Sequence, residues 1–536
     1  MTGPKARGAA TAPHADGAPA AERAARRTPE GLSWVDVRRG LYRDSITLMR
    51  ISRGLAERDG VLDALTAMAT DLNLELLGRM GFTAPPDVGP NDLVVAIRAA
   101  DEATLGGARD LLDSMLTEAP AAGASGFADA GQRPARTISA AAARLRAARG
   151  AATLALVSVP GRHAFVEAMD ALEAGLNVMI FSDNVPVKQE ILLKDAAARR
   201  GLIVMGPDCG TAVVGGAGLG FANAVRPGPV GVVAASGTGS QQVMCLLDAA
   251  GVGVSHAIGV GGRDLSAEVS GRGTLQALAA LNADPATELI IVVSKPPAPP
   301  VAALIREAAR RLSTPVVFGV LGDPADRSPA TGWREHDLTA AVEAALSMLG
   351  VGVPQWPSWP AAVPRPPRPG ALRGLFVGGT LCAEALLVAA DALGTVHSNL
   401  AGRPAGTTGH IMIDFGDDRL TEGRAHPMID PSLRLDRLAA EFADPGCAVV
   451  LLDVVLGYAA EPDPAARLAP LIGGAGDTAV VVSLCGTPHD PQGRDRQAAA
   501  LRDAGAAVFA SNAAAARHAV SLIEISAQSV SEGHRR

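Results

Sequence analysis

The chain has few aromatic residues, few cysteines and no long apolar run. Aromatic residues make up 3% of the 536 residues, and the five cysteines are far apart without any C-x-x-C pair. This argues against a zinc site and against a disulfide framework. No apolar run reaches the ~18–20 residues of a membrane helix, and the start of the chain lacks the apolar segment of a secretory signal. With a net charge of −7 and no basic stripe, we expect a cytoplasmic protein without nucleic-acid or membrane partners.

The pattern of apolar segments indicates a multidomain α/β protein. Apolar strands alternate with amphipathic helices, which is typical of doubly wound parallel sheets. The chain is too long for one core. We divide it into a disordered tail at 1–32, a small N-terminal α/β domain at 33–120, a linker at 121–150, a Rossmann-like domain at 151–228, an α/β domain at 229–352, a proline-rich linker at 353–370, an α/β domain at 371–525, and a tail at 526–536.

The most informative segment is VGVVAASGTGSQQ, in which an apolar strand runs into a glycine-rich turn that opens a helix. The turn consists of Ser236, Gly237, Thr238, Gly239 and Ser240. Its glycines let backbone N–H groups converge on an anion, and the first helical turn carries about +0.5 charge. The hydroxyl groups can add donors. The competing interpretation is that the glycines only let the chain turn between strand and helix.

Other candidate residues follow apolar strands or lie in loops. His426, next to Arg424 in GRAHPMID, can shuttle a proton or carry a phosphoryl group, or it can simply hydrogen-bond the loop backbone. Arg424 can clamp a carboxylate or phosphate, or form a surface ion pair. Lys295 follows a buried strand, where a cation meets an anionic ligand in such sheets, unless it is simply solvated. The Asp417–Asp418 pair is more typical of a solvated turn than of a Mg²⁺ site, and no metal is assigned.

Three strand ends of the 151–228 block carry VPGRHA, FSDNVP and MGPDCGT. Because ligands of parallel sheets bind at the carboxyl ends of strands, we expect these loops to be neighbours. Their candidate cofactor-binding residues are Pro160, Asn184, Pro207, Asp208 and Cys209. For Cys209, a packed thiol is favoured over a nucleophile.

Several segments, taken in their order along the chain, resemble known families. The run from 153 to 325 resembles the α subunit of succinyl-CoA synthetase, through AGLNVMIFSDNVP, GPDC, VGVVAASGTGSQQ and IGVGGRDL. The block at 371–525 resembles the carboxyl-terminal ligase domain of its β subunit, through GGTLCAEALL and IMIDFGDD. The order of GPDCGT, ASGTGSQQ, GGRDLS, VSKPPA, GGTLC and GRAHPMID is similar to the FdrA family, over about residues 33–525.

This resemblance implies a CoA-binding-type domain at 151–228, followed by two flavodoxin-like ligase domains. In the synthetase, two helices aim their N-termini at one phosphoryl group held on a histidine. The first helix would begin at the Ser236–Gly239 turn. The second would begin either after Gly378, Gly379 and Thr380 or at the turn of Gly416, Asp417 and Asp418.

The chain also departs from the synthetase pattern. It has no Gly-His-Ala-Gly-Ala phosphohistidine motif, and Lys295 falls near the place of the glutamate that partners that histidine. There is no nucleotide-grasp domain, no P-loop and no glycine fingerprint for the CoA phosphates. CoA therefore remains open as a cofactor, and no nucleotide site is identified on this chain.

The resemblance implies a subunit that transfers a carbamoyl or acyl group through an acyl phosphate. The preferred reaction is that of an oxamate carbamoyltransferase, in which carbamoyl phosphate and oxamate give oxalurate and phosphate. The alternatives are an ADP-forming acyl-CoA synthetase subunit whose nucleotide domain lies on a partner, and a non-catalytic scaffold subunit. The expected partners are a small carboxylate, an acyl or carbamoyl phosphate and a companion subunit in an oligomer.

Overall fold

The computed structural model describes residues 31–41, 43, 45–86, 88–118, 135–148, 153–322, 337–400, 408–421 and 426–533. The contacts between residues divide the chain into two compact units. One consists of residues 1–42 and 51–119, and the other of residues 43–50 and 120–536. Nearly all of the predicted tail at 1–32 and half of the predicted linker at 121–150 lie outside the described residues. No helix in the described ranges has both the length and the apolar character needed to cross a bilayer.

The N-terminal domain alternates strands and helices as the sequence predicts. Its elements are β1 Leu32–Arg38, α1 Ser45–Ala56, β2 Val61–Met68, α2 Asp71–Arg79, β3 Leu93–Ala99 and α3 Glu102–Glu118. The three strands lie in the order β1-β3-β2, and β3 is antiparallel to both neighbours. The sheet is therefore not doubly wound, because the buried strand β3 inserts between β1 and β2.

The next domain has a short parallel sheet and is called the α4–β6 domain. It consists of α4 Ile138–Ala148, β4 Leu154–Val157, α5 Gly161–Glu173, β5 Asn177–Ile180, α6 Val187–Arg200 and β6 Val204–Met205. Its strands pair in the order β4-β5-β6. Helix α4 lies within the predicted linker, but Ala142 is buried in the core of this domain. The Ser139 amide also donates to Asp170 Oδ2 at 3.1 Å, so α4 belongs to the domain.

The third domain, called the first sheet domain, has a six-stranded sheet. Its elements are β7 Thr211–Val214, β8 Ala217–Gly220, β9 Pro227–Ala234, α7 Gly237–Ala249, β10 Val254–Gly259, α8 Arg272–Ala283, β11 Leu289–Ser294, α9 Pro299–Arg310, β12 Val316–Val320 and α10 Leu338–Met348. The strand order is β12-β11-β9-β10-β7-β8. The predicted boundary at 228 therefore falls too late, because the β7–β8 hairpin extends this sheet by antiparallel pairing with β10.

The fourth domain, called the second sheet domain, has a seven-stranded sheet. Its elements are β13 Ser358–Trp359, β14 Ala371–Phe376, α11 Gly379–Leu393, β15 Val396–Ser398, β16 His410–Asp414, α12 Asp418–Thr421, α13 Ser432–Ala443, β17 Cys447–Val455, α14 Pro464–Gly473, β18 Ala479–Cys485, α15 Arg494–Asp503, β19 Ala506–Phe509 and α16 Asn512–Gly533. The order is β13-β19-β18-β17-β14-β16-β15. Strand β13 is an antiparallel edge strand from the proline-rich segment, where proline costs no ladder bond. Helix α16 continues through most of the predicted tail at 526–536.

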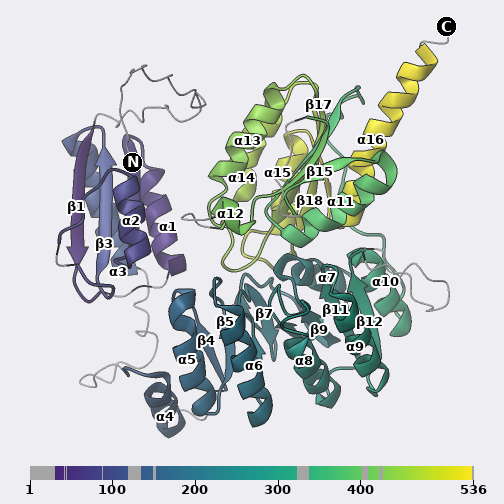
Figure 1. Ribbon diagram of the computed structural model, residues 1–536. Helices are drawn as coiled ribbons and strands as arrows, with labels where there is room; N and C mark the ends of the chain where they lie inside the picture. Colours follow the sequence, from purple (N-terminus) through teal and green to yellow (C-terminus); the bar gives the residue numbers. More distant parts are fainter. Residues whose placement is uncertain are drawn as a thin grey trace, which may run out of the picture. The chain divides into compact units, whose positions relative to one another are not determined.

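The two sheet domains share one apolar core. Helices α7 and α10 on the first sheet face α11 and α16 on the second, and buried residues from both sheets and all four helices form a single cluster. Helices α13, α14 and α15 cover the opposite face of the second sheet (Figure 1). Burying this surface between the two sheets stabilises the pairing at about 25 cal/mol per Å² of apolar area.

A polar network also joins the two sheet domains. Asp490 Oδ1 accepts the Ala224 amide at 2.7 Å, and Oδ2 accepts Asn223 Nδ2 and the Thr487 amide, both at 2.8 Å. Asp490 is 4% exposed. Its two oxygens therefore connect the loop before β9 with the loop after β18.

Replacing Asp490 by asparagine is expected to weaken this junction. The amide group would present an N–H donor where the carboxylate accepts hydrogen bonds, which costs about 1–3 kcal/mol. We expect a lower midpoint of urea unfolding for D490N. The matched control is D495N, because Asp495 is exposed and pairs with its sequence neighbour Arg494 at 2.9 Å. Equal midpoints for both variants would contradict the role of Asp490.

Candidate active site

The strand order of each sheet places one helix N-terminus at the point where the winding direction reverses. Strand β9 lies between β10 and β11, and β14 lies between β16 and β17. The chain leaves β9 into α7 and leaves β14 into α11. In open α/β sheets this crevice at the carboxyl ends of the strands is where ligands bind.

The two strand-to-helix corners, one at the start of α7 and one at the start of α11, lie against each other. Ser236 is the N-cap of α7 and accepts the Gly239 amide at 2.9 Å. Its Oγ donates to Thr380 Oγ1, in the first turn of α11, at 2.6 Å. An ideal Cβ on Gly378 would lie only 2.8 Å from Thr238 Oγ1. The helix N-termini of the two sheet domains therefore converge at the Thr380 corner.

Four amides at these corners are free to bind an anion. The N–H groups of Gly237, Thr238, Gly379 and Thr380 donate to no acceptor in the described part of the chain. Amides at the start of a helix carry partial positive charge and favour an anionic ligand. The Ser240 hydroxyl, another predicted anion ligand, donates to Gly237 O at 2.6 Å, so the helix already uses this donor.

One cation and one carboxylate flank the start of α11. Lys295 is exposed directly after β11, and an ideal Cβ on Gly379 would lie 3.0 Å from its Nζ. Asp414 Oδ2 contacts the same position. Asp414 ends β16 and is 6% exposed, and burial raises the pKa of its carboxyl to about 6, against the opposing effect of Lys295.

Asp453, which is not among the predicted site residues, supports the start of α11. It is fully buried in β17 and accepts the amides of Val377 and Gly378, each at 2.8 Å. Its other partner is Arg434, at 3.1 Å. Burial raises the pKa of Asp453 to about 6. A single acid in the apolar run CAVVLLDVV was the signal in the sequence that could have identified it.

His426 lies next to Gly416, and its ring contacts the protein backbone. Its Nδ1 accepts the Met428 amide at 3.2 Å, and an ideal Cβ on Gly416 would lie 2.9 Å from its Nε2. Burial lowers the pKa of His426 to about 4, so the ring is neutral at pH 7. Its ring centroid is 6.2 Å from that of Phe221 in the first sheet domain.

Two other predicted site residues of this region are Arg424 and Asp417. Arg424 lies outside the described residues. Asp417 is paired with Arg419 at 2.9 Å, and this side-chain contact lowers the pKa of Asp417. The Asp417 carboxylate is therefore neutralised locally. No cluster of three metal-ligating side chains occurs among the described residues.

The three strand-end loops of the α4–β6 domain are neighbours, as predicted. The position of a Cβ on Gly161, next to Pro160, is already filled by the backbone of Asp183 and Asn184. A Cβ on Gly261 would lie 2.5 Å from Pro207 O. The Asp208 amide also donates to Ser182 O at 2.9 Å, so the ends of β4, β5 and β6 lie at one edge, beside the loop after β10.

Three of the predicted cofactor-binding residues at this edge have an unusual backbone conformation or a buried side chain. Asn184 and Asp208 have positive φ angles of 54° and 60°, which non-glycine residues adopt rarely and mostly at constrained sites. Burial raises the pKa of the Cys209 thiol to about 12. Cys209 is therefore a packed thiol, because only a thiolate is an effective nucleophile.

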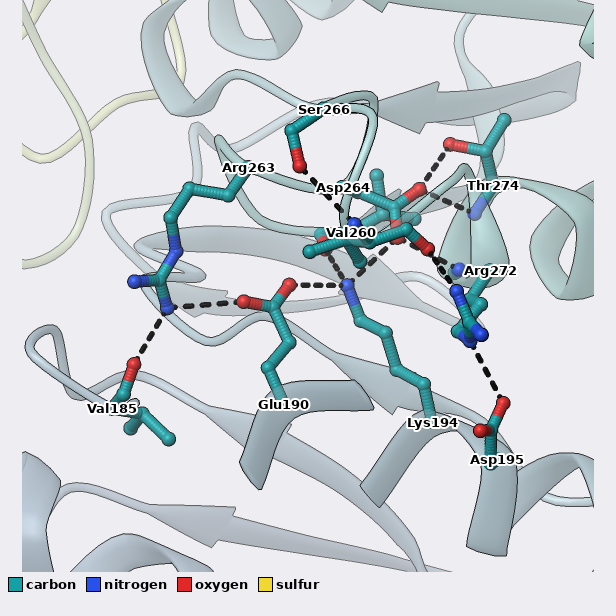
Figure 2. A network of polar contacts seen from close by, with 12 residues as sticks. Val185, Glu190, Lys194, Asp195, Val260, Arg263, Asp264, Ser266, Arg272 and Thr274 are labelled. Carbon is teal, nitrogen blue, oxygen red and sulfur yellow. Dashed lines mark hydrogen bonds and ion pairs between the residues drawn. The ribbon is translucent and has the colours of Figure 1, made fainter. Parts of the chain in front are cut away.

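A buried charge network joins this edge to the first sheet domain (Figure 2). Lys194 is fully buried, and its Nζ donates to Glu190 Oε1, Asp264 Oδ1 and Val260 O, each at 2.8 Å. All three ammonium donors are thus satisfied. Arg263 pairs with Glu190 Oε2 at 3.0 Å, so two cations balance two carboxylates.

The same network orients a helix and a loop. Asp264 accepts the amides of Gly273 and Thr274 at 2.8 and 2.9 Å, which anchors the start of α8. Arg263 donates to Val185 O at 2.7 Å, next to Asn184. The network therefore fixes the FSDNVP loop to the GGRDLS loop, and none of its members is among the predicted site residues.

The second sheet domain is of the CoA-ligase type. The family model described as CoA-ligase matches residues 375–522, within the second sheet domain. The chain belongs to the same family as YahF of Escherichia coli K12, an uncharacterized protein to which it is 37% identical over 501 residues, covering 88% of this chain and 95% of YahF.

More distant similarity is confined to parts of the chain. The α subunit of a malate–CoA ligase from Methylorubrum extorquens is 26% identical, over 33% of this chain and 61% of the relative. The α subunit of an ADP-forming succinate–CoA ligase from Aquifex aeolicus is 29% identical, over 27% of this chain and 48% of the relative. The chain thus spans only about half to three fifths of these ligase subunits.

Solved structures with similarity include a dinucleotide-forming acetyl-coenzyme A synthetase from Ca. Korarchaeum cryptofilum. It is 17% identical, with a TM-score of 0.29, and covers 75% of this chain and 88% of that chain. An ATP citrate lyase from Methanothrix soehngenii is 22% identical, with a TM-score of 0.31, and covers 41% of this chain and 38% of that chain.

The N-terminal domain matches a second family model. It is described as the heavy metal-associated domain of AllF and covers residues 32–133. This range contains neither cysteine nor histidine, which supply the thiolate and imidazole ligands of metal sites. The residues present therefore do not fit a heavy-metal site of thiolate or imidazole ligands.

Proposed function

We propose that this chain is the acyl-transferring subunit of a CoA-synthetase-like enzyme and uses an acyl phosphate at the paired corners of α7 and α11. The most specific form of this proposal is an FdrA-type oxamate carbamoyltransferase. The observation that carries it is the contact between two helix N-termini, four of whose amides have no acceptor in the described part of the chain, with the Lys295 ammonium beside Gly379. Preorganised donors of this kind stabilise negative charge that develops during transfer.

The chemistry of carbamoyl transfer matches these donors. The nitrogen of oxamate attacks the carbamoyl carbon of carbamoyl phosphate, a C–N bond forms, and the C–O bond to the phosphate breaks. Phosphate leaves with the bonding electron pair, and the nitrogen loses one proton, so the products are oxalurate and hydrogen phosphate. The corner amides and Lys295 would hold the phosphate throughout, and the reaction needs no ATP.

The second candidate is an acyl-CoA synthetase subunit whose nucleotide domain lies on a partner. The similarity to the two ligase α subunits favours it. CoA would then bind at the edge formed by the ends of β4, β5 and β6. The N-termini of α5 and α6 open onto this edge and have no side-chain cap, so their amides are available to an anionic ligand.

The test compares two reactions with the purified full-length protein, alone and with candidate companion subunits. One contains carbamoyl phosphate and oxamate, and the other contains ATP, CoA and succinate. Phosphate release is followed in both. We expect turnover in the first reaction, without ATP. Turnover only in the second would replace carbamoyl transfer by CoA ligation, and none in either with every companion would favour a scaffold subunit.

A further inference from the structure

We propose that Asp414 is the base of the transfer reaction and acts beside Lys295 at the start of α11. This inference rests on the proposed function. The Asp414 carboxylate would take the proton from the acceptor nitrogen as that nitrogen forms its bond to the acyl carbon. Lys295 would bind the phosphate as its C–O bond breaks, and the proton on Asp414 would then pass to the departing phosphate. Charge and atoms balance without any further reactant.

The side chain of Asn399 holds the backbone of Asp414 in a fixed position. Asn399 Oδ1 accepts the Asp414 amide at 2.9 Å, and Asn399 Nδ2 donates to Asp414 O at 2.8 Å. The side chain is fixed separately, because Oδ1 accepts the Gly416 amide at 2.9 Å. These bonds leave only Oδ2 for chemistry.

The second carboxylate oxygen of Asp414 faces the start of α11. Asp414 Oδ2 contacts the position of a Cβ on Gly379 and has no hydrogen-bond donor in the described part of the chain. Lys295 Nζ lies 3.0 Å from the same position. Because Oδ2 is not among the buried side-chain atoms that lack a partner, it reaches solvent and is open to a ligand, although the side chain is only 6% exposed. Glycine at 379 leaves room for both side chains at the start of α11.

Asp414 is not needed to cap helix α11. The amides of Val377 and Gly378 already bind the two oxygens of Asp453, whose charge is balanced by Arg434. One carboxylate therefore has the structural role at this corner, and the other is left free. Two carboxylates in different environments are a common way of separating structural and catalytic roles.

The charged groups around Asp414 make it a base that is ionised at neutral pH. Lys295 lowers the pKa of Asp414, whereas Asp453 and Asp417 raise it, and burial is the largest effect. His426, on the other side of Gly416, is uncharged at neutral pH because burial lowers its pKa. With a pKa of about 6, the carboxylate forms above pH 6 and is more basic than an ordinary aspartate.

The experiment compares D414N with wild type in whichever of the two reactions wild type catalyses. Removing a general base costs about 10²–10⁴-fold in rate, so we expect kcat to fall at least ~100-fold while KM changes little. The wild-type kcat/KM should rise with pH through a midpoint near 6, and D414N should lose this rise. Asparagine cannot ionise but keeps the size of the side chain.

Binding of inorganic phosphate, measured by calorimetry, separates a chemical role from a structural one. D414N should bind phosphate at least as tightly as wild type, because a negative charge has been removed. K295M should bind it at least ~10-fold more weakly, by the loss of a charged donor. The control is D436N, because Asp436 is exposed on α13 and lies outside the proposed site.

The possible outcomes separate the two proposals. Wild-type kcat and an unchanged pH profile in D414N would overturn the role of Asp414 and leave the proposed function intact. Loss of both turnover and phosphate binding in D414N would make Asp414 a structural residue and also overturn the inference. A wild-type protein without turnover in either reaction would overturn the proposed function, and the role of Asp414 with it.

Discussion

Replacing Gly239 by alanine is expected to lower turnover at least ~100-fold, equivalent to about 2.7 kcal/mol of barrier. The new Cβ would lie 2.6 Å from Ser236 Oγ and 3.0 Å from both Thr380 Cγ2 and Val293 Cγ1. The serine would have to give up the cap of α7 and the bond to Thr380. The β-branched neighbours have few rotamers in which to retreat. The extra methyl group would therefore push the two corners apart.

Stability should change less than activity in G239A. Overpacking of this kind costs about 1–3 kcal/mol, which thermal unfolding followed by circular dichroism can register. The matched control is G473A, because a Cβ on helical Gly473 meets nothing within 4 Å and alanine favours a helix. A folded G239A protein with wild-type turnover would mean that contact between α7 and α11 does not matter for the reaction.

Replacing Lys194 by methionine is expected to give the largest loss of stability. Methionine keeps the length of the side chain but removes the ammonium that bridges Glu190 and Asp264. Arg263 still pairs with Glu190, so Asp264 would be left as a buried charge without its cation. Breaking a buried pair in this way costs about 3–5 kcal/mol. We expect a clearly lower urea midpoint for K194M.

One matched variant is the control for this effect. K188M makes the same change at an exposed lysine in the same helix α6, and we expect its stability within about 0.5 kcal/mol of wild type. Equal midpoints for K194M and K188M would show that the network contributes nothing to folding.

The order of secondary structure was predictable because it depends on local patterns. Strands β9, β11 and β17 are continuous apolar runs, and the helices between them show the periodicity of helices with one buried face. The strand order β19-β18-β17-β14-β16 of the second sheet domain is the flavodoxin-like arrangement. The turn at Ser236 was also recognisable, because a serine N-cap followed by glycines has a local signature.

The errors arose where pairing depends on distant segments. The β7–β8 hairpin was assigned to the preceding domain, because only its bonds with β10 reveal the sheet that it extends. Helix α4 was assigned to a linker, because its packing on α5 is not visible in its own residues. The roles of Asp453 and Lys194 are not predictable from the sequence, because a buried charge is recognised only through its partners.

The sequence by itself determined the α/β class, the succession of strands and helices, and the two glycine corners that begin α7 and α11. These features depend on residues that are close in the chain, through periodicity, capping and backbone freedom. Only the tertiary structure decided that Ser236 meets Thr380, that Asp453 supports the second corner, and that Asp414 faces Lys295. Such contacts join residues at least 75 positions apart. Those of Ser236 and Asp414 exist only when the two sheet domains pack their helices into one core, and that of Asp453 exists because β17 pairs with β14.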